Sequence, residues 1–516
     1  MELKMMIRYI SHSLNVSACI TFQGETMKKQ YSLRSALAVA AVSMSLAGAS
    51  LPLTLSSASA ASVTNISVWA SGGDSTQEQN AIKYAVTQYN KMYAGKYKAN
   101  LTFVPNISTV QENSPASNEG NVMETDGPTL PFLAWTGKLA PISKYVSKSA
   151  VDQQVGVVRA QDTYKGNLYA MAVINSTLAI YGNKHLLNAA GITACPANTP
   201  ATTSCYPTQW ADAWTGAQFT QVLAKLKATP SASNDGGYVW SANAAYGGEY
   251  WPYAFLPLLN SAGSPIVSNN SANVLKSTSV YNALSTIASW VPYMDPTAGS
   301  ATTGGNGGAF ANGDLPLAYG GHWQYPGYKT GAVSTTYGAS NLVAIPLPNM
   351  GKGAKDGAGS NTWTIGASAS SAQKVAAGAF LNYISTAAFT KLMTYGNGQT
   401  TTSGGVTSEV YGNGAVPANS GGIASNPTYA KGGILYQMGL ASENACQGGV
   451  ITSTCVATPR PVTPGYPAIS QAFQTLFSSL FSASATTPVD TNTIKSLVAT
   501  AVDSINTNFQ TYNNFK

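Results

Sequence analysis

Alternating apolar and polar stretches near the amino end predict a strand, a helix and a second strand. Residues 65–70 are β-prone, and the turn residues 71–74 follow them. The next apolar positions recur at helical spacing, at Ile82, Ala85, Val86, Tyr89 and Met92. Ser75 and Glu78 form a capping box where this helix begins, and residues 101–104 supply the second strand. This order predicts a β-α-β unit and therefore a parallel sheet.

The same kind of pattern continues toward the carboxyl end. Amphipathic helices are predicted around residues 219–226, 280–288, 375–384 and 494–509, and apolar runs at 168–180 and 342–347 predict strands between them. The Gly-rich stretches have no periodicity, and we find no internal repeat. Strands that alternate with helices over this length predict an α/β protein with mainly parallel sheets flanked by helices.

Residues 27–60 have the organisation of a secretory signal peptide. Lys28 and Lys29 precede an apolar stretch at 36–46, and Ala58-Ser59-Ala60 supplies a cleavage motif of small residues. We interpret residues 1–26 as an upstream extension, because they lack folding periodicity. The alternative, a retained membrane anchor, is disfavoured because glycine, proline and serines interrupt the apolar stretch. Without a lipoprotein cysteine no lipid anchor is expected, and we predict export to the periplasm or the outer face of the cell membrane.

Charge is scarce along the chain. Residues 1–60 carry five of the 27 basic and two of the 20 acidic side chains, so 22 and 18 remain after cleavage, a net charge of about +4. This balance does not favour nucleic acid as a partner. Only 9% of all residues are charged. Because few groups change charge as the pH falls, we expect the folded protein to tolerate acid.

Four cysteines after residue 60 form two close pairs in sequence, Cys195 with Cys205 and Cys446 with Cys455. Each pair closes a short polar loop. In an exported protein this arrangement predicts two local disulfides. Metal binding is the alternative, but the spacings do not suit zinc and no histidine lies nearby, so we predict no metal site and no cofactor.

Three stretches in a fixed order resemble a known family. Residues 162–185, DTYKGNLYAMAVINSTLAIYGNKH, combine a Gly-containing turn with a strand that enters a hinge. Residues 309–323, AFANGDLPLAYGGHW, end in Gly-Gly-His-Trp, and residues 363–385 combine a strand, an Ala-Ser turn and a helix. In order and spacing they resemble the extracellular solute-binding proteins of the maltose-binding type over nearly all of residues 62–516. Thr129 stands where that family usually has Asp, and Met171 or Ala172 replaces its hinge proline.

The resemblance implies a two-lobed fold of the periplasmic-binding-protein kind, type II, with a ligand cleft between lobes that close by hinge motion. One lobe is expected to comprise residues 62–173 and 346–398, and the other residues 174–345 and 399–516. The implied function is capture of a carbohydrate and its delivery to the membrane permease subunits of an ABC importer. The implied protein is a monomer without catalytic residues.

Candidate ligand residues are those expected near the carboxyl ends of strands, where open α/β sheets bind ligands. Asp74 lies in the first such loop, although helix capping would equally explain it. The resemblance places Trp135 where the family has an aromatic platform, and it aligns Glu249 and Trp251 with a segment that supplies an acid and an aromatic ring together. For each of these residues the alternative is an ordinary surface or core position.

Trp323 is the strongest candidate, because Gly320 and Gly321 allow the backbone to turn at a strand end and direct the indole into the cleft. Packing in the core is the alternative role for Trp323. Similar reasoning adds Trp363 and Tyr466, and Asn175 near the hinge can donate and accept hydrogen bonds. For these three residues too, packing alone is the alternative.

Two other classes of protein compete with this interpretation. An exported glycoside hydrolase also combines aromatic rings with carboxylates in a cleft, and Asp74 with Glu249 would be its pair, but the sequence does not place them at the required separation. A surface-layer or adhesion protein would suit the Ser-, Thr- and Gly-rich composition, but it predicts β-rich repeats that the sequence lacks. Only His185 and His322 follow residue 60, which leaves little material for a histidine-based triad.

Overall fold

The computed structural model describes residues 62–515 apart from the short stretches 233–236, 244–246, 296–307, 404–405, 447–449 and 485–486. The predicted upstream extension, 1–26, and the predicted signal peptide, 27–60, lie outside the described residues. None of the described helices is both long enough and apolar enough to cross a membrane.

The β-α-β unit at the amino end is confirmed. Strand β1 (Thr64–Ser71) pairs in parallel with β2 (Tyr97–Val104), in the register Thr64↔Tyr97 through Ser71↔Val104. Helix α1 (Thr76–Met92) connects them, and Ser75 forms the predicted capping box with Glu78. The buried face of α1 consists of the apolar positions Ala81, Ile82, Ala85, Val86 and Tyr89. Local capping and apolar spacing therefore fix this unit.

A six-stranded sheet forms the centre of the first lobe, in the order β17-β6-β14-β3-β1-β2. Its other strands are β3 (Val122–Asp126), β6 (Ala170–Asn175), β14 (Ser360–Ile365) and β17 (Val416–Pro417). Strand β14 runs antiparallel to both β3 and β6, so β3 and β6 run in the same direction. Strand β17 comes from the 399–516 segment that the sequence prediction gives to the second lobe, yet it pairs with β6.

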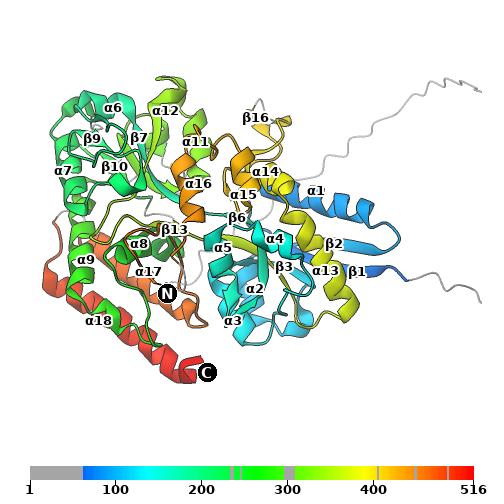
Figure 1. The fold of residues 1–516 in the computed structure, drawn as a ribbon. Coiled ribbons are helices and arrows are strands. Elements are labelled where there is room, and N and C mark those ends of the chain that lie inside the picture. Colours follow the sequence, from blue (N-terminus) through cyan, green and yellow to red (C-terminus); the bar gives the residue numbers. More distant parts are fainter. Residues whose placement is uncertain are drawn as a thin grey trace, which may run out of the picture. The chain divides into compact units, whose positions relative to one another are not determined.

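A four-stranded sheet, in the order β10-β11-β7-β12, forms the centre of the second lobe. Its strands are β7 (Leu178–Asn183), β10 (Trp240–Ser241), β11 (Leu317–Gly321) and β12 (Leu342–Ile345). Only Ser176 and Thr177 separate β6 of the first sheet from β7 of the second. The carboxyl edge of the first sheet therefore meets the second sheet directly at this crossover (Figure 1).

The four predicted amphipathic helices are present. They are α7 (Gly216–Lys227), α9 (Thr278–Trp290), α13 (Ser371–Ile384) and α18 (Thr491–Thr511). Helices α1 and α13, the latter with Phe380, supply much of the first core, together with Ile365 of β14. Helices α7, α9, α18, α8 (Tyr250–Ser261) and α17 (Tyr466–Ala483) supply the second core, and α17 packs along α18 (Figure 1).

Shorter elements complete the described chain. The helices are α2 (Ile107–Asn113), α3 (Leu130–Trp135), α4 (Lys148–Asp152), α5 (Gly156–Gln161), α6 (Lys184–Ala189), α10 (Gly308–Ala311), α11 (Tyr325–Thr330), α12 (Ala332–Thr335), α14 (Ala387–Tyr395), α15 (Ser420–Ser425) and α16 (Tyr436–Glu443). The strands are β4 (Thr163–Tyr164), β5 (Asn167–Leu168), β8 (Thr193–Ala194), β9 (Cys205–Tyr206), β13 (Asp356–Ala358), β15 (Thr400–Ser403), β16 (Val406–Glu409) and β18 (Ala457–Pro459).

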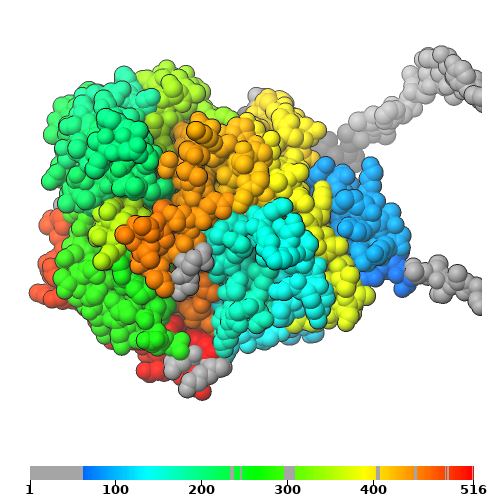
Figure 2. Space-filling model, in the orientation of Figure 1, coloured from blue at the N-terminus to red at the C-terminus, as the bar shows by residue number. Residues whose placement is uncertain are grey.

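Both predicted disulfides are present, Cys195–Cys205 and Cys446–Cys455. The first joins the segments of β8 and β9. The second joins Cys446 to Cys455 ahead of β18, in the part of the chain whose orange elements lie between the green and cyan parts in Figure 2. Each bridge stabilises a local loop and does not join distant parts of the chain.

Candidate functional site

The ends of strands from both sheets meet at the crossover between β6 and β7. Because β3 and β6 run in the same direction, Asp126 and Asn175 lie at the same edge of the first sheet. In the second sheet Gly321, the last residue of β11, pairs with Leu178, the first residue of β7. The loops after β1, β3, β6 and β11 therefore come close to the boundary of the two sheets, which is where an open α/β fold binds ligands.

Two carboxyl groups from this edge lie against each other. Asp74, in the loop after β1, lies close enough to Glu124 of β3 for each carboxyl group to influence the pKa of the other. The backbone N–H of Ser71 donates to Glu124 Oε2 at 2.9 Å, and Asn361 Nδ2 donates to Oε1 at 3.3 Å. Burial, with the charge of Glu78 as a smaller cause, raises the pKa of Asp74 to about 7. Burial and the neighbouring Asp74 raise the pKa of Glu124, so the pair retains a proton in mildly acidic solution.

Arg460 joins two carboxylates from different parts of the fold. Its Nη2 lies 2.7 Å from Asp126 Oδ1 at the end of β3, and its Nη1 lies 2.5 Å from Glu249 Oε1 at the beginning of α8. A further bond links Nη1 to Asp126 Oδ2 at 3.3 Å. Arg460 is only 8% exposed. A guanidinium has the fork geometry that such simultaneous contacts require, which a lysine lacks.

Glu249 is fixed by two hydroxyl groups besides Arg460. Tyr466 Oη and Ser470 Oγ, both on α17, donate to its two carboxylate oxygens. Burial raises the pKa of Glu249, and the positive charge of Arg460 opposes this effect. The rings of Tyr253 and Tyr466 lie under the guanidinium, 5.5 and 5.9 Å from its carbon. Glu249 and Tyr466, both predicted from the sequence, therefore belong to one polar cluster.

Trp323 connects to this cluster through Tyr253. Its ring is half-buried and packs 5.6 Å from the Tyr253 ring and 6.4 Å from the Tyr250 ring. A Cβ on Gly321 would lie 2.1 Å from the Trp323 ring, so only glycine leaves room for this orientation of the indole. With φ of -81°, Gly321 has a backbone that any residue adopts, so glycine is needed here for space and not for the expected turn, and the ring lies next to the polar cluster.

Asn175 and Trp135 also lie at the boundary but already contact other parts of the chain. Asn175, at the end of β6, is buried and donates to Ser442 Oγ at 3.0 Å. Trp135, at the end of α3, packs edge-on against Tyr512 and Phe515 at ring distances of 5.8 and 5.0 Å. None of these contacts involves the cluster around Arg460.

Trp251 and Trp363 lie in the two cores. Trp251 is 7% exposed and packs against Phe481 and Phe255 in the second core. Trp363 is 2% exposed in β14 and packs against Phe380 in the first core. The structure therefore does not bring these two rings together with Trp323. Both rings pack in a core, which is the alternative role that the sequence had left open.

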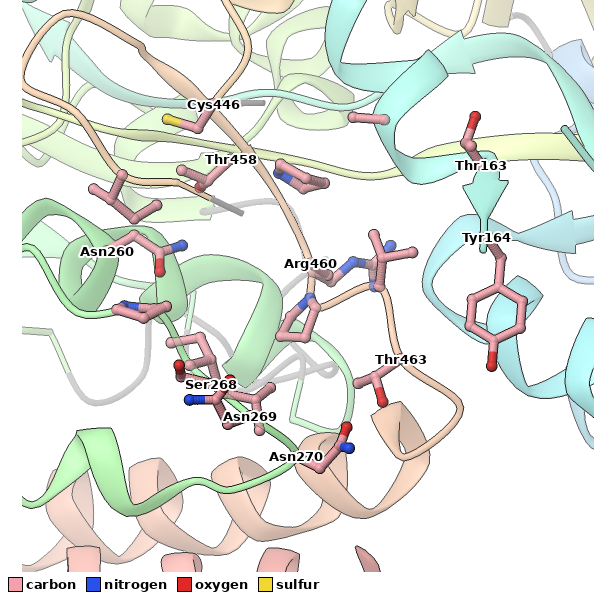
Figure 3. A pocket seen from close by; sticks show the side chains of 18 of the residues that line it. Thr163, Tyr164, Asn260, Ser268, Asn269, Asn270, Cys446, Thr458, Arg460 and Thr463 are labelled. Carbon is pink, nitrogen blue, oxygen red and sulfur yellow. The ribbon is translucent and has the colours of Figure 1, made fainter. Parts of the chain in front are cut away.

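A cavity of about 780 Å³ adjoins the polar cluster at Arg460 (Figure 3). Thr163 and Tyr164 line one side, and Asn260, Ser268 and Asn269 line the other, with Arg460 between them. None of the eight ligand residues predicted from the sequence lines it.

Sequence reasoning missed Arg460, Asp126 and Glu124. Asp126 carried a usable signal, since it is the last residue of β3, which pairs in parallel with β1, and the carboxyl ends of such strands are where ligands bind. Arg460 also carried one, because Arg159 and Arg460 are the only arginines after residue 60. The contacts themselves were not predictable, because Arg460 is 334 residues from Asp126 and 211 from Glu249.

Comparison with known proteins gives one family and many similar folds. The family model described as bacterial extracellular solute-binding protein matches residues 72–391. No curated protein sequence matches the chain.

Three solved structures illustrate the similarity of fold. The sugar-binding protein MalE from Xanthomonas citri has a TM-score of 0.63 at 17% identity, covering 87% of this chain and 99% of that one. The GacH receptor of Streptomyces glaucescens, solved unliganded and with acarbose, has a TM-score of 0.61 at 18% identity, with coverage of 87% and 99%. The cyclic alpha-maltosyl-1,6-maltose binding protein from Arthrobacter globiformis has a TM-score of 0.61 at 17% identity, with coverage of 87% and 100%.

Proposed function

This chain belongs to the bacterial extracellular solute-binding protein family, and we propose that it captures a carbohydrate between its two lobes and delivers it to the permease subunits of an ABC importer. The names of the three solved relatives describe binding of sugars or of acarbose, which supports a carbohydrate as the ligand. The proposal includes export, with cleavage near Ala60, a monomeric protein and no catalytic residues.

The placement of Trp323 beside the Glu249 cluster is the observation that supports this function most strongly. An indole face suits the apolar C–H surface of a sugar ring, and carboxylates and amides accept or donate hydrogen bonds to hydroxyl groups. We assign the sugar to Trp323, Glu249 and Tyr466 on one side and to Asp74 and Asn175 on the other. Micromolar affinity needs about 8 kcal/mol, which a stacked ring and several hydrogen bonds of about 1 kcal/mol each can supply.

Closure of the lobes would couple binding to delivery. The short crossover between β6 and β7 is anchored by Asp356, whose Oδ1 accepts a hydrogen bond from the Leu178 N–H at 2.8 Å and whose Oδ2 accepts one from the Thr177 hydroxyl. Arg460 then bridges Asp126 and Glu249 across the boundary. A sugar that contacts both sides stabilises the closed state by its difference in affinity for the two states, and the permease would recognise that state.

The test is a thermal-shift and calorimetry screen against mono- and oligosaccharides, with product analysis of the same mixtures. We expect one sugar class to raise Tm without being consumed. Trp323→Ala should abolish the shift while the protein stays folded, and Tyr395→Ala, an exposed ring on α14, is the matched control. Released reducing sugar would contradict a binding protein, and unchanged affinity of Trp323→Ala would remove this ring from the site.

A further inference from the structure

The cavity beside Arg460 is a separate space from the proposed sugar site. Helix α5 and the β4–β5 hairpin form one wall, and the loop after α8 and the linker between β18 and α17 form the other (Figure 3). Its volume of about 780 Å³ lies within the usual range for small-molecule sites. The residues assigned to the sugar lie outside its lining, so a ligand here would be held by different side chains.

Positive charge is concentrated on this cavity. Arg159 and Arg460, the only arginines after residue 60, both line it, and Lys165 is a third cation. Among the residues that the structure describes, no aspartate or glutamate lines it. Asp126 and Glu249 are two carboxylates against the one guanidinium of Arg460, so the positive charge that the cavity offers comes from the exposed Arg159 and Lys165. The wall that carries Arg159 and Lys165 therefore attracts an anion, whereas the carboxylates of Asp126 and Glu249 behind Arg460 oppose it on the other side.

Neutral polar groups add hydrogen-bonding capacity to the charge. Asn260 is buried and lines the cavity together with Thr163 and Thr463 (Figure 3), and the Thr163 hydroxyl already donates to the Arg159 carbonyl at 2.8 Å. Asn269 and Asn270 adopt left-handed backbone angles, with φ of 51° and 56°, in the turn of the loop after α8. The ring of Tyr164 supplies an apolar surface, and Lys165 Nζ lies 5.6 Å from its centre.

We propose that this cavity binds a small carboxylated solute, of which a uronic acid is the simplest example. Arg159 and Lys165 would pair with the carboxylate, because a guanidinium binds carboxylate oxygens in a bidentate way and an ammonium adds a point charge. The amides of Asn260 and Asn269 and the hydroxyl of Thr463 would bind the remaining polar groups. This inference does not depend on the proposed sugar site, because the two sites share no assigned residue.

The test compares two probes of similar size and different charge, glucuronate and glucose, by titration calorimetry on the full chain. We expect glucuronate to bind at least about tenfold more tightly than glucose at this site, and to weaken as salt is raised. The double variant Arg159→Gln/Lys165→Gln should lose about tenfold in glucuronate affinity. The matched control Lys96→Gln/Lys98→Gln removes two charges outside the cavity lining and should leave the affinity unchanged.

The Trp323→Ala variant separates this site from the sugar site. Trp323→Ala should still bind glucuronate even if it no longer binds any neutral sugar. Glucuronate should also bind if the parent protein binds no neutral sugar at all. Loss of glucuronate binding in Trp323→Ala would mean that the acid occupies the sugar site and would overturn the proposal. Unchanged binding in the double variant, or no binding of glucuronate or galacturonate at about 10 mM, would also overturn it.

Discussion

Arg460 and Asp126 form a two-pronged ion pair although they are 334 residues apart in the sequence. Arg460 comes from the linker between β18 and α17, and Asp126 ends a strand of the first sheet. The same guanidinium bonds Glu249 at the start of α8. A single side chain therefore links the two lobes, and its removal would leave two carboxylates facing each other without a cation.

Arg460→Ala should destabilise the folded protein by about 2–3 kcal/mol. Breaking a fully buried ion pair costs about 3–5 kcal/mol. The side chains of Asp126 and Glu249 keep 30% and 37% exposure, so solvent screens part of the loss. Denaturant unfolding measures the change, with Arg159→Ala, an exposed arginine, as the control. A loss no larger than that of the control would show that the bridge does not contribute to stability.

Trp135 and Phe515 should be energetically coupled across the fold. Their rings are 5.0 Å apart at 83°, the edge-on geometry that contributes about 0.5–1.5 kcal/mol beyond burial of area. A double-mutant cycle of Trp135→Ala and Phe515→Ala should therefore give a coupling free energy of about 1 kcal/mol. The control is a double-mutant cycle of Phe132→Ala and Phe515→Ala, because the ring contacts of the described residues include none between these two. Additive effects for Trp135 and Phe515 would contradict the contact.

The parts of the fold that were predictable are those whose signals are local. Ser75 and Glu78 lie three positions apart and cap the helix that they predict. The two disulfides close loops of about ten residues, so their spacing alone indicates them. Strand β17 shows the opposite case, because its two residues, Val416–Pro417, carry no periodicity and join β6 only through long-range pairing. Helix α8 was not predicted as a helix, because it is buried along its whole length and has no polar face.

The candidate site was predictable only in part, because most of its contacts join residues that are far apart in the sequence. Glycines next to Trp323 indicated a turn at a strand end, and the ring does lie beside the polar cluster. Trp251 and Trp363 were also predicted as ligand residues, but they fill the two cores, since an aromatic side chain suits either environment. Glu249 was predicted without Arg460, because no local pattern relates residues 211 positions apart.

Removing the second disulfide with Cys446→Ser/Cys455→Ser should lower the free energy of unfolding by a little under 3 kcal/mol, as loop-closure entropy predicts for about ten residues. Cys446 and Ile451 also line the cavity at Arg460, so the variant tests both the stability of the fold and the integrity of the cavity wall. Denaturant unfolding gives the stability, and Cys195→Ser/Cys205→Ser is the matched control for a loop of similar length away from the cavity. If glucuronate affinity falls only in the first variant, the disulfide also orders the cavity wall.

Stability should rise as the pH is lowered from about 8 toward 4. Burial raises the pKa of Asp162 to about 7 and that of Asp356 to about 8, and Asp74 behaves similarly. Between the ordinary pKa of 3.8 and these values the folded state binds more protons than the unfolded state, so stability is present at low pH and is lost as the pH rises. Burial lowers the pKa of His322 to about 3, which acts in the opposite direction below 6.5, but three carboxyl groups outweigh one imidazole.

Asp162→Asn isolates one of these carboxyl groups. Thr362 and Ser360 donate hydrogen bonds to the two oxygens of Asp162, at 2.8 and 3.3 Å, and an asparagine carbonyl can still accept one of them. Because asparagine does not ionise, the variant should lose less stability than the parent between pH 4 and 8, and its Tm should depend less on pH. The exposed Asp152→Asn is the control. A parent Tm that falls steeply on acidification from pH 7 would contradict both this assignment and the acid tolerance expected from the scarcity of charge.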